Sequence, residues 1–245
     1  VVDISAPLGP GTPMWQRPSP AGAVRTELMT AGEGSPPSDF TVSFIHVFSH
    51  AGTHIDAPKH ALRGAGDLLS LPLGLLNGPA FVLNVPDGAQ AVGREELAAA
   101  FPRAPVPERL LLRTRHSREG DMRRAEFQSG YVALDQSAAE WAVENGVKLV
   151  GVDYLSAVVE ADIVQGHHTL LGGGVVLLEG LDLLLPGEDL RGGGGATLLC
   201  LPLPIEGADG APTRAALAFP NSRRLAPGAA NFQLLKKYFR YTLRF

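Results

Sequence analysis

The sequence contains a single cysteine, no long apolar segment and no excess of basic residues. Because Cys200 is alone, the chain cannot form an intramolecular disulfide, and its leucine neighbours predict a buried strand position. The chain has no run of about 18 apolar residues that could span a membrane, and its N-terminus lacks the charged-then-apolar pattern of a signal peptide. A net charge of −4 provides no basic surface for nucleic acid. We therefore expect a soluble, cytoplasmic protein that binds neither nucleic acid nor membranes.

A chain of 245 residues suits one substantial hydrophobic core, so one domain is a better prediction than two. A helix is expected over 94–101. A second helix is expected from Ser137, which has the capping-box spacing to Glu140, with a stop at Gly146. Strands are expected over residues 40–44, 80–85, 109–113, 147–153, 175–180 and 196–202. The close succession of helix and strand favours a mixed α/β fold.

Three segments permit more than one interpretation. The loop from Pro7 to Pro20 holds Trp15, which either packs against the core or covers a pocket. His116 lies in a charged, irregular segment, and we expect a solvated loop residue there, with a role beside the substrate as the alternative. Residues 219–245 are basic and aromatic; we predict an appendage outside the core, although an amphipathic or partner-binding tail has the same composition.

Four of the seven histidines lie close together, at His46, His50, His54 and His60, with Asp56 among them. Neutral imidazole and carboxylate are ligands that divalent metals take in proteins. His54 and Asp56 point to the same side if the backbone is extended, and Gly52 can bend the chain so that His50 joins them. This stretch therefore predicts most of a metal site.

A second group of ligand residues lies downstream. Glu179 closes an otherwise apolar strand, and a buried carboxylate must be paired, ligated or protonated. His167 or His168 would provide a fifth ligand. Five mixed ligands suit two metals that share a carboxylate better than one structural ion. His60 is either a further ligand or a free imidazole suited to proton transfer, and a metal-binding protein without turnover remains an alternative.

Residues 50–60, HAGTHIDAPKH, resemble the HxGTHxDxPxH signature of the metal-dependent cyclase family, whose best-known members are bacterial kynurenine formamidases. The similarity runs from Asp3 to about Ala218. It includes blocks at residues 111–114, 139–141, 151–156 and 208–214. The resemblance implies one compact α/β domain, residues 1–218, with a β-barrel-like mixed sheet, flanking helices and a swivelling β/β/α topology. It also implies a homodimer or homotetramer.

The resemblance further implies roles for individual residues. Two divalent ions, Zn²⁺ or alternatively Mn²⁺, would be held by His50, His54, Asp56, His167 and Glu179. His167 is preferred over His168 because its spacing to Glu179 matches the family's downstream His and Glu. His60 matches the catalytic acid/base, and Trp15 falls where relatives place an aromatic residue over the substrate.

The implied activity is a metal-dependent amidohydrolase acting on a small molecule at a C–N bond other than a peptide bond. In the arylformamidase reaction, a metal-activated hydroxide converts N-formylkynurenine to kynurenine and formate, a step of tryptophan catabolism. The alternatives within the family are a cyclic-amide hydrolase of the isatin type and a biosynthetic cyclase or dehydratase.

Overall fold

The computed structural model describes residues 1–15, 24–29, 42–102, 105–184 and 195–219. Seven strands of these residues form a closed mixed barrel, so the predicted α/β fold with a barrel-like sheet is confirmed. Around the barrel the strands are β10 (Gly210–Ala218), β4 (His54–Asp56), β8 (Val176–Glu179), β7 (Leu149–Val152), β6 (Arg109–Arg113), β5 (Gly78–Asn84) and β9 (Ala196–Pro202). Strand β9 pairs with β10 and closes the barrel, and β1 (Val2–Asp3) pairs with the C-terminal part of β10 on the edge opposite β9.

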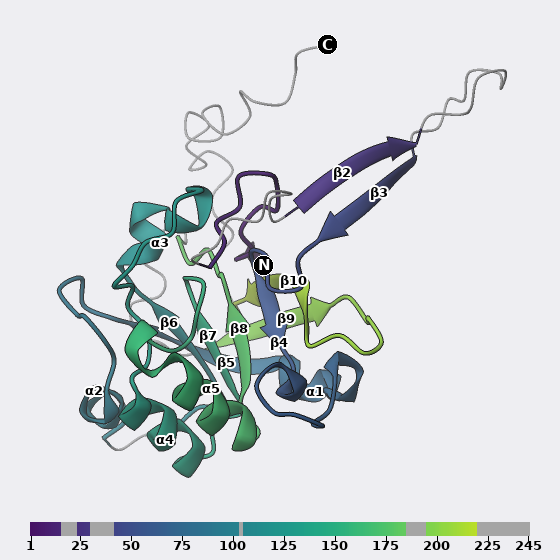
Figure 1. The fold of residues 1–245 in the computed structure, drawn as a ribbon. Coiled ribbons are helices and arrows are strands. Elements are labelled where there is room, and N and C mark those ends of the chain that lie inside the picture. Colours follow the sequence, from purple (N-terminus) through teal and green to yellow (C-terminus); the bar gives the residue numbers. More distant parts are fainter. Residues whose placement is uncertain (16–23, 30–41, 103–104, 185–194, 220–245) are drawn as a thin grey trace, which may run out of the picture.

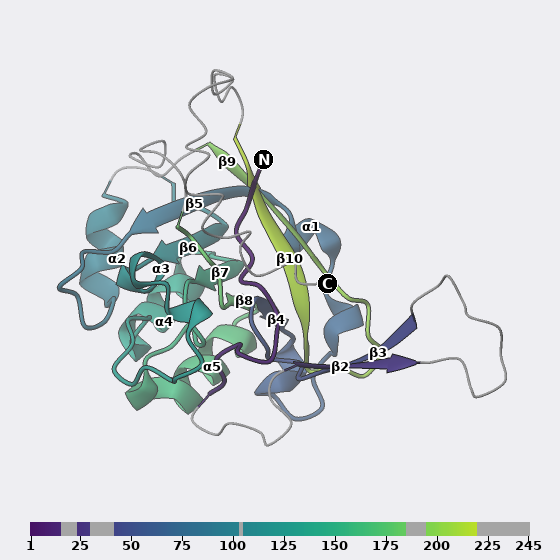
Figure 2. The ribbon, with the colours of Figure 1, turned by 90° about the horizontal axis from the view of Figure 1, so that it is seen from above.

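The larger helices cover one side of the barrel, and a two-stranded ribbon projects away from the other side (Figures 1 and 2). The helices on the covered side are α2 (Arg94–Ala100), α4 (Gln136–Glu144) and α5 (Ile163–Gly172). Shorter helices are α1 (Leu73–Leu76) and α3 (Arg115–Glu119), with single 3₁₀ turns at Pro58–His60, Leu68–Ser70, Asp121–Arg123 and Glu160–Asp162. The ribbon consists of β2 (Val24–Met29) and β3 (Val42–Val47). No helix in the described part of the chain is both long and apolar enough to cross a membrane.

The strands between the barrel interior and the helices are apolar on both faces. On β6, Leu111 points into the barrel, where it belongs to the same cluster as Leu178 and Leu198. Its neighbours Leu110 and Leu112 point outward into the cluster beneath the helices. Strands buried on both faces have continuous apolar runs rather than alternation, which is why the segment 109–113 was recognisable from sequence.

Two local predictions need correction. The N-cap of α4 is Asp135, whose side chain accepts a hydrogen bond from Ala138 N at 2.9 Å, whereas Ser137 lies inside the helix and donates to Asp135. The half-buried strand predicted at 40–44 is described from residue 42 onward as part of β3. Its Phe44 is exposed because, among the described residues, β3 pairs only with β2, and only the base of the ribbon, at Val24 and Val47, packs against the rest of the protein. Beyond Phe219, the predicted appendage lies outside the described residues.

Gly180 fixes the distance between the end of β8 and the loop that precedes β4. It has φ +69°, and a Cβ atom there would overlap the backbone carbonyl of Gly52. Thr53 Oγ1 donates to Gly180 O at 2.6 Å across the same contact. The close approach therefore places the histidine-rich loop against the end of β8.

We expect Gly180→Ala to lower the free energy of unfolding by about 2–5 kcal/mol, since left-handed strain and overpacking add together. Gly174→Ala is the matched control: Gly174 has φ +78° and open space around it, so only the strain of about 1–2 kcal/mol applies. Urea denaturation of both variants provides the comparison. Equal losses of unfolding free energy in the two variants would show that the close contact with Gly52 does not contribute to the effect.

Candidate metal centre

Strands β4 and β8 bring three ligand-type side chains to one face of the sheet. His54 lies directly opposite Glu179 in the antiparallel register, and Asp56 lies opposite Leu177. Ile55, between the two ligand residues of β4, points into the barrel core. Because side chains alternate along a strand, His54 and Asp56 share the outer face with Glu179. All three are buried.

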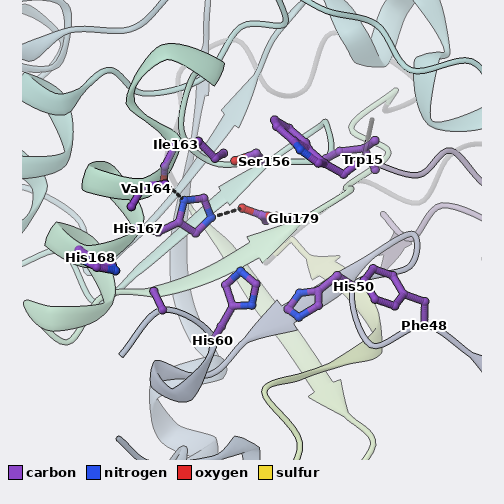
Figure 3. A pocket seen from close by; sticks show the side chains of 12 residues that line it. Trp15, Phe48, His50, His60, Ser156, Ile163, Val164, His167, His168 and Glu179 are labelled. Carbon is purple, nitrogen blue, oxygen red and sulfur yellow. Dashed lines mark hydrogen bonds and ion pairs between the residues drawn. The ribbon is translucent and has the colours of Figure 1, made fainter. Parts of the chain in front are cut away.

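Helix α5 supplies His167 to the same face. The helix packs through Leu170 against the outer cluster, and His167 Nδ1 donates to Ile163 O at 2.6 Å. Its Nε2 therefore carries no proton in the neutral ring and lies 3.6 Å from Glu179 Oε1 (Figure 3). His168 is exposed on the next position of the helix and joins none of the ligand clusters found among the described residues.

The loop before β4 and the turn after it complete the cluster. His50 Nδ1 lies 2.7 Å from Asp56 Oδ1. His60 ends the 3₁₀ turn Pro58–His60, and its Nε2 lies 4.0 Å from Asp56 Oδ2. His54 Nδ1 donates to Gly52 O at 2.9 Å, so its Nε2 faces the carboxylates. The six predicted residues His50, His54, Asp56, His60, His167 and Glu179 thus converge on one volume.

The buried donor atoms fit a divalent metal. Among the described residues, His54 Nε2 and Asp56 Oδ2 are fully buried without a hydrogen-bond partner, an arrangement that is costly unless an ion completes it. His54 Nε2 lies 3.4 Å from Asp56 Oδ1 and 3.5 Å from Glu179 Oε2. Ligands bound tetrahedrally at about 2.1 Å are roughly 3.4 Å apart. Two compact groups share Asp56, one with His50 and His54 and the other with His60 and His167.

The charges in the centre depend on one another. Burial lowers the pKa of His54, but Asp56 and Glu179 outweigh this effect and raise it to about 10. His167 responds in the same way, and its pKa rises to about 9 chiefly through Glu179. Burial also opposes ionisation of Asp56, yet His50 and His54 hold the pKa of that carboxyl well below its usual range. Without metal, protonated imidazoles therefore balance the two buried carboxylates.

A cavity of about 420 Å³ opens above the cluster (Figure 3). Its polar base is formed by His50, His60, His167 and Glu179. The walls are largely apolar and come from Trp15, Phe48, Leu155, Ile163 and Val164, with Ser156 and His168 as polar exceptions. A small molecule in this cavity would therefore contact the ligand cluster at one end and apolar side chains around its body.

Trp15 satisfies both alternatives left open by the sequence. Its ring packs edge-on against Phe127 at 5.0 Å and against Tyr131 at 5.5 Å between centroids. The same side chain lines the cavity. The N-terminal loop is thus anchored to the protein body by the residue that forms part of the cavity wall.

The expectation that His116 is a solvated loop residue is wrong. His116 lies in α3 and is 3% exposed. Its Nδ1 lies 2.6 Å from Asp121 Oδ2, and its Nε2 accepts a hydrogen bond from Val132 N at 3.0 Å. Both ring nitrogens are therefore engaged in holding the segment that leads to Tyr131.

Asp209 is the residue of the cluster that sequence reasoning did not assign. Its Oδ2 lies 2.9 Å from His50 Nε2 and 3.5 Å from His60 Nδ1. Burial alone would raise the pKa of Asp209, but the hydrogen bond with His50 lowers it. The residue falls within the family-like block 208–214, which was the available signal, although nothing in the sequence indicates contact with residues 50 and 60.

A closed mixed barrel with a buried group of imidazoles and carboxylates on its outer face defines a single-domain α/β protein with a candidate metal site. A family model described as "Putative cyclase" matches residues 2–157, and the chain belongs to this family. Cyclase-like proteins 3 and 1 of Arabidopsis thaliana are 33% and 34% identical over 223 residues, 89% of this chain and 79% and 84% of theirs. Cyclase-like protein 3 of Oryza sativa subsp. japonica is 36% identical over 177 residues, 69% of this chain and 62% of the rice protein, less than two thirds of its length.

Solved structures share the fold. A structure described as a predicted metal-dependent hydrolase from Bacillus stearothermophilus is 27% identical, with a TM-score of 0.70 over 88% of this chain and 96% of that one. Isatin hydrolase A from Ralstonia solanacearum has a TM-score of 0.72 at 24% identity over 89% and 91% of the two chains. The second likeness shows the fold alone.

We expect His167→Ala to lose zinc and His168→Ala to keep it, because only His167 faces Glu179. The loss for His167→Ala should exceed the roughly 10–100-fold that is typical of changes outside the ligand set. Equilibrium zinc titration of both variants measures the difference. If His167→Ala kept its full zinc affinity, or if His168→Ala lost it, the assignment of His167 rather than His168 as the ligand would be wrong.

We expect the metal-free chain to become less stable as the pH rises from 7 to 10. The folded-state pKa values of about 10 for His54 and about 9 for His167 lie above the ordinary value near 6.5. Their stabilisation is complete below about pH 6.5 and is lost as the pH passes through 9 and 10. Urea denaturation with a chelator measures the decline, which should be smaller in His167→Gln. A metal-free chain that is equally stable at pH 10 would contradict this charge balance.

Proposed function

We propose that the protein is a metal-dependent hydrolase that cleaves the C–N bond of an arylformamide, with N-formylkynurenine as the first candidate substrate. The observation that carries this proposal is a buried group of ligand-type side chains that meets the base of an apolar cavity. Asp56 lies in one compact group with His50 and His54 and in a second with His60 and His167. Glu179 lies 3.5 Å from His54 and 3.6 Å from His167. The imidazole of His60 lines the same cavity. Family membership and the resemblance to a metal-dependent hydrolase support it.

Two divalent ions, Zn²⁺ or alternatively Mn²⁺, would be held by His50, His54, Asp56, His167 and Glu179. Such ions, when bound, polarise a carbonyl group and make hydroxide available at neutral pH. The protein fixes these ligands through backbone contacts. Ile163 O holds the His167 ring, Gly52 O holds the His54 ring, and Ala157 N donates to Glu179 Oε1 at 2.7 Å.

His60 is assigned to proton transfer. It is the most exposed imidazole of the cluster, with 32% of its side chain accessible, and it lines the cavity. Its Nε2 points towards Asp56 but lies 4.0 Å from that carboxylate. As an unprotonated nitrogen it can take a proton from the attacking water and then deliver that proton to the departing nitrogen of an amide bound in the cavity.

The cavity also supports a second candidate, a cyclic amide of the isatin type. Trp15 and Leu155 provide apolar surface for an aromatic ring. Among the described lining residues there is no lysine or arginine to bind the α-carboxylate of N-formylkynurenine. A neutral lactam has no carboxylate and so needs no cationic partner. Attack on its carbonyl opens the ring at the C–N bond.

The homodimer or homotetramer and the cytoplasmic location expected from the sequence stay predictions. A biosynthetic cyclase or dehydratase remains an alternative from the family resemblance. A metal-binding protein without turnover is the alternative of a different class, and His60 distinguishes it, since a structural site has no use for a free imidazole.

The decisive experiment measures hydrolysis of N-formylkynurenine, isatin and a simple aryl ester by the zinc- and manganese-loaded protein and by His60→Ala. We expect turnover of at least one of the two C–N substrates. The variant should lose roughly 10²–10⁴-fold in kcat while keeping its metal.

The matched control is His46→Ala, which removes an exposed imidazole on the ribbon and should leave kcat unchanged. Full activity in metal-loaded His60→Ala would contradict the assignment of His60 as the acid/base. Metal binding without turnover of any substrate in the panel would favour the non-catalytic alternative.

A further inference from the structure

Asp209 occupies a position between two imidazoles of the centre. A single oxygen, Oδ2, lies 2.9 Å from His50 Nε2 and 3.5 Å from His60 Nδ1. The two rings lie beside each other, with centroids 4.2 Å apart and planes inclined by 46°. The carboxylate thus contacts both the first residue of the predicted ligand set and the residue assigned to proton transfer.

The barrel determines where this carboxylate lies. Asp209 O accepts a hydrogen bond from Ala57 N at 2.9 Å, and the next residue, Gly210, pairs with Asp56 in the β10–β4 register. A Cβ atom on Gly210 would come within 2.9 Å of His50 Cε1, so glycine permits the close approach of that ring. The position of Asp209 is therefore set by strand pairing rather than by a free surface loop.

The contacts have a consequence for the protons on both rings. An ionised carboxylate only accepts hydrogen bonds, so His50 Nε2 and His60 Nδ1 must be the donors. The neutral ring of His60 then carries no proton on Nε2, which lies 4.0 Å from Asp56 Oδ2. His50 Nδ1 lies 2.7 Å from Asp56 Oδ1, so it also donates in the metal-free chain and loses its proton only where a metal ion takes its place.

We propose that Asp209 is a positioning residue that fixes the orientation of His50 and His60 together and keeps a proton on His50 Nε2 and on His60 Nδ1. His60 Nε2 then faces the centre unprotonated, and so does His50 Nδ1 once a metal ion displaces its proton. The part that concerns His60 rests on the proton-transfer role proposed above. Carboxylates that accept from the distal nitrogen of a histidine orient metal ligands and catalytic bases in the same way. Here one carboxylate serves a ligand and a base at once.

The first test reads the tautomer directly, without substrate or metal. Long-range ¹H–¹⁵N spectra of histidine-labelled, zinc-free protein are recorded at a pH where His60 is neutral, and His60 is assigned by its absence in His60→Ala. We expect the proton on Nδ1 in the wild type and in Asp209→Asn, whose amide oxygen still accepts a hydrogen bond. In Asp209→Ala nothing holds that proton, so the Nε2-protonated form should appear. A wild-type proton on Nε2, or an unchanged tautomer in Asp209→Ala, would overturn the proposal.

The second test uses whichever substrate is turned over, at saturating metal. Asp209→Ala should lower kcat by roughly 10–100-fold with KM changed less than about threefold, and Asp209→Asn should recover part of the loss. The control is Asp67→Asn. Asp67 Oδ2 accepts from Gly207 N at 2.7 Å and so supports the same loop without touching an imidazole. An equal loss of kcat in Asp67→Asn would show that loop support, not imidazole positioning, explains the effect. If no substrate is turned over, the proposed function fails while the tautomer measurement still decides the role of Asp209.

Discussion

The structure around the centre depends on the burial of two carboxylates, Asp56 and Glu179, within one small volume. A buried, uncompensated carboxylate costs several kcal/mol, and two adjacent ones also repel each other. In the metal-free chain, protonated His54 and His167 provide the compensating charge, which is why their pKa values are raised. A divalent ion would provide the same positive charge without protons. Metal binding should therefore release the protons that His54 and His167 carry in the metal-free chain.

The order of the strands in the barrel brings the two carboxylates and their histidine partners together. Strands β10, β4 and β8 are neighbours in the barrel although they lie far apart in the sequence, and α5 lies over the face that carries the ligands. Glycines at positions 180 and 210 allow the backbone of one segment to approach the next more closely than a side chain would permit. The cavity then lies where the N-terminal loop, the β3–β4 loop and α5 meet (Figure 3).

Features that repeat along the chain could be predicted from the sequence, and features that depend on contacts between distant segments could not. The buried strand 109–113 and the alternation of His54 and Asp56 follow from local periodicity. The convergence of Glu179 with the first group was anticipated because a carboxylate ending an apolar strand requires a partner. Asp209 and the burial of His116 were missed, since strand pairing and helix packing decide both. The exposure of Phe44 was missed for the same reason: its alternating pattern does not reveal that the strand leaves the barrel.

The central claim is that residues 50–60 serve two purposes, metal ligation as far as Asp56 and proton transfer at His60. Anomalous diffraction from crystals grown with zinc tests this most directly. We expect ions coordinated at about 2.0–2.2 Å by His50, His54, Asp56, His167 and Glu179, with His60 Nε2 beyond bonding distance. Zinc bound directly by His60, or found only at His116 and Asp121, would contradict the claim.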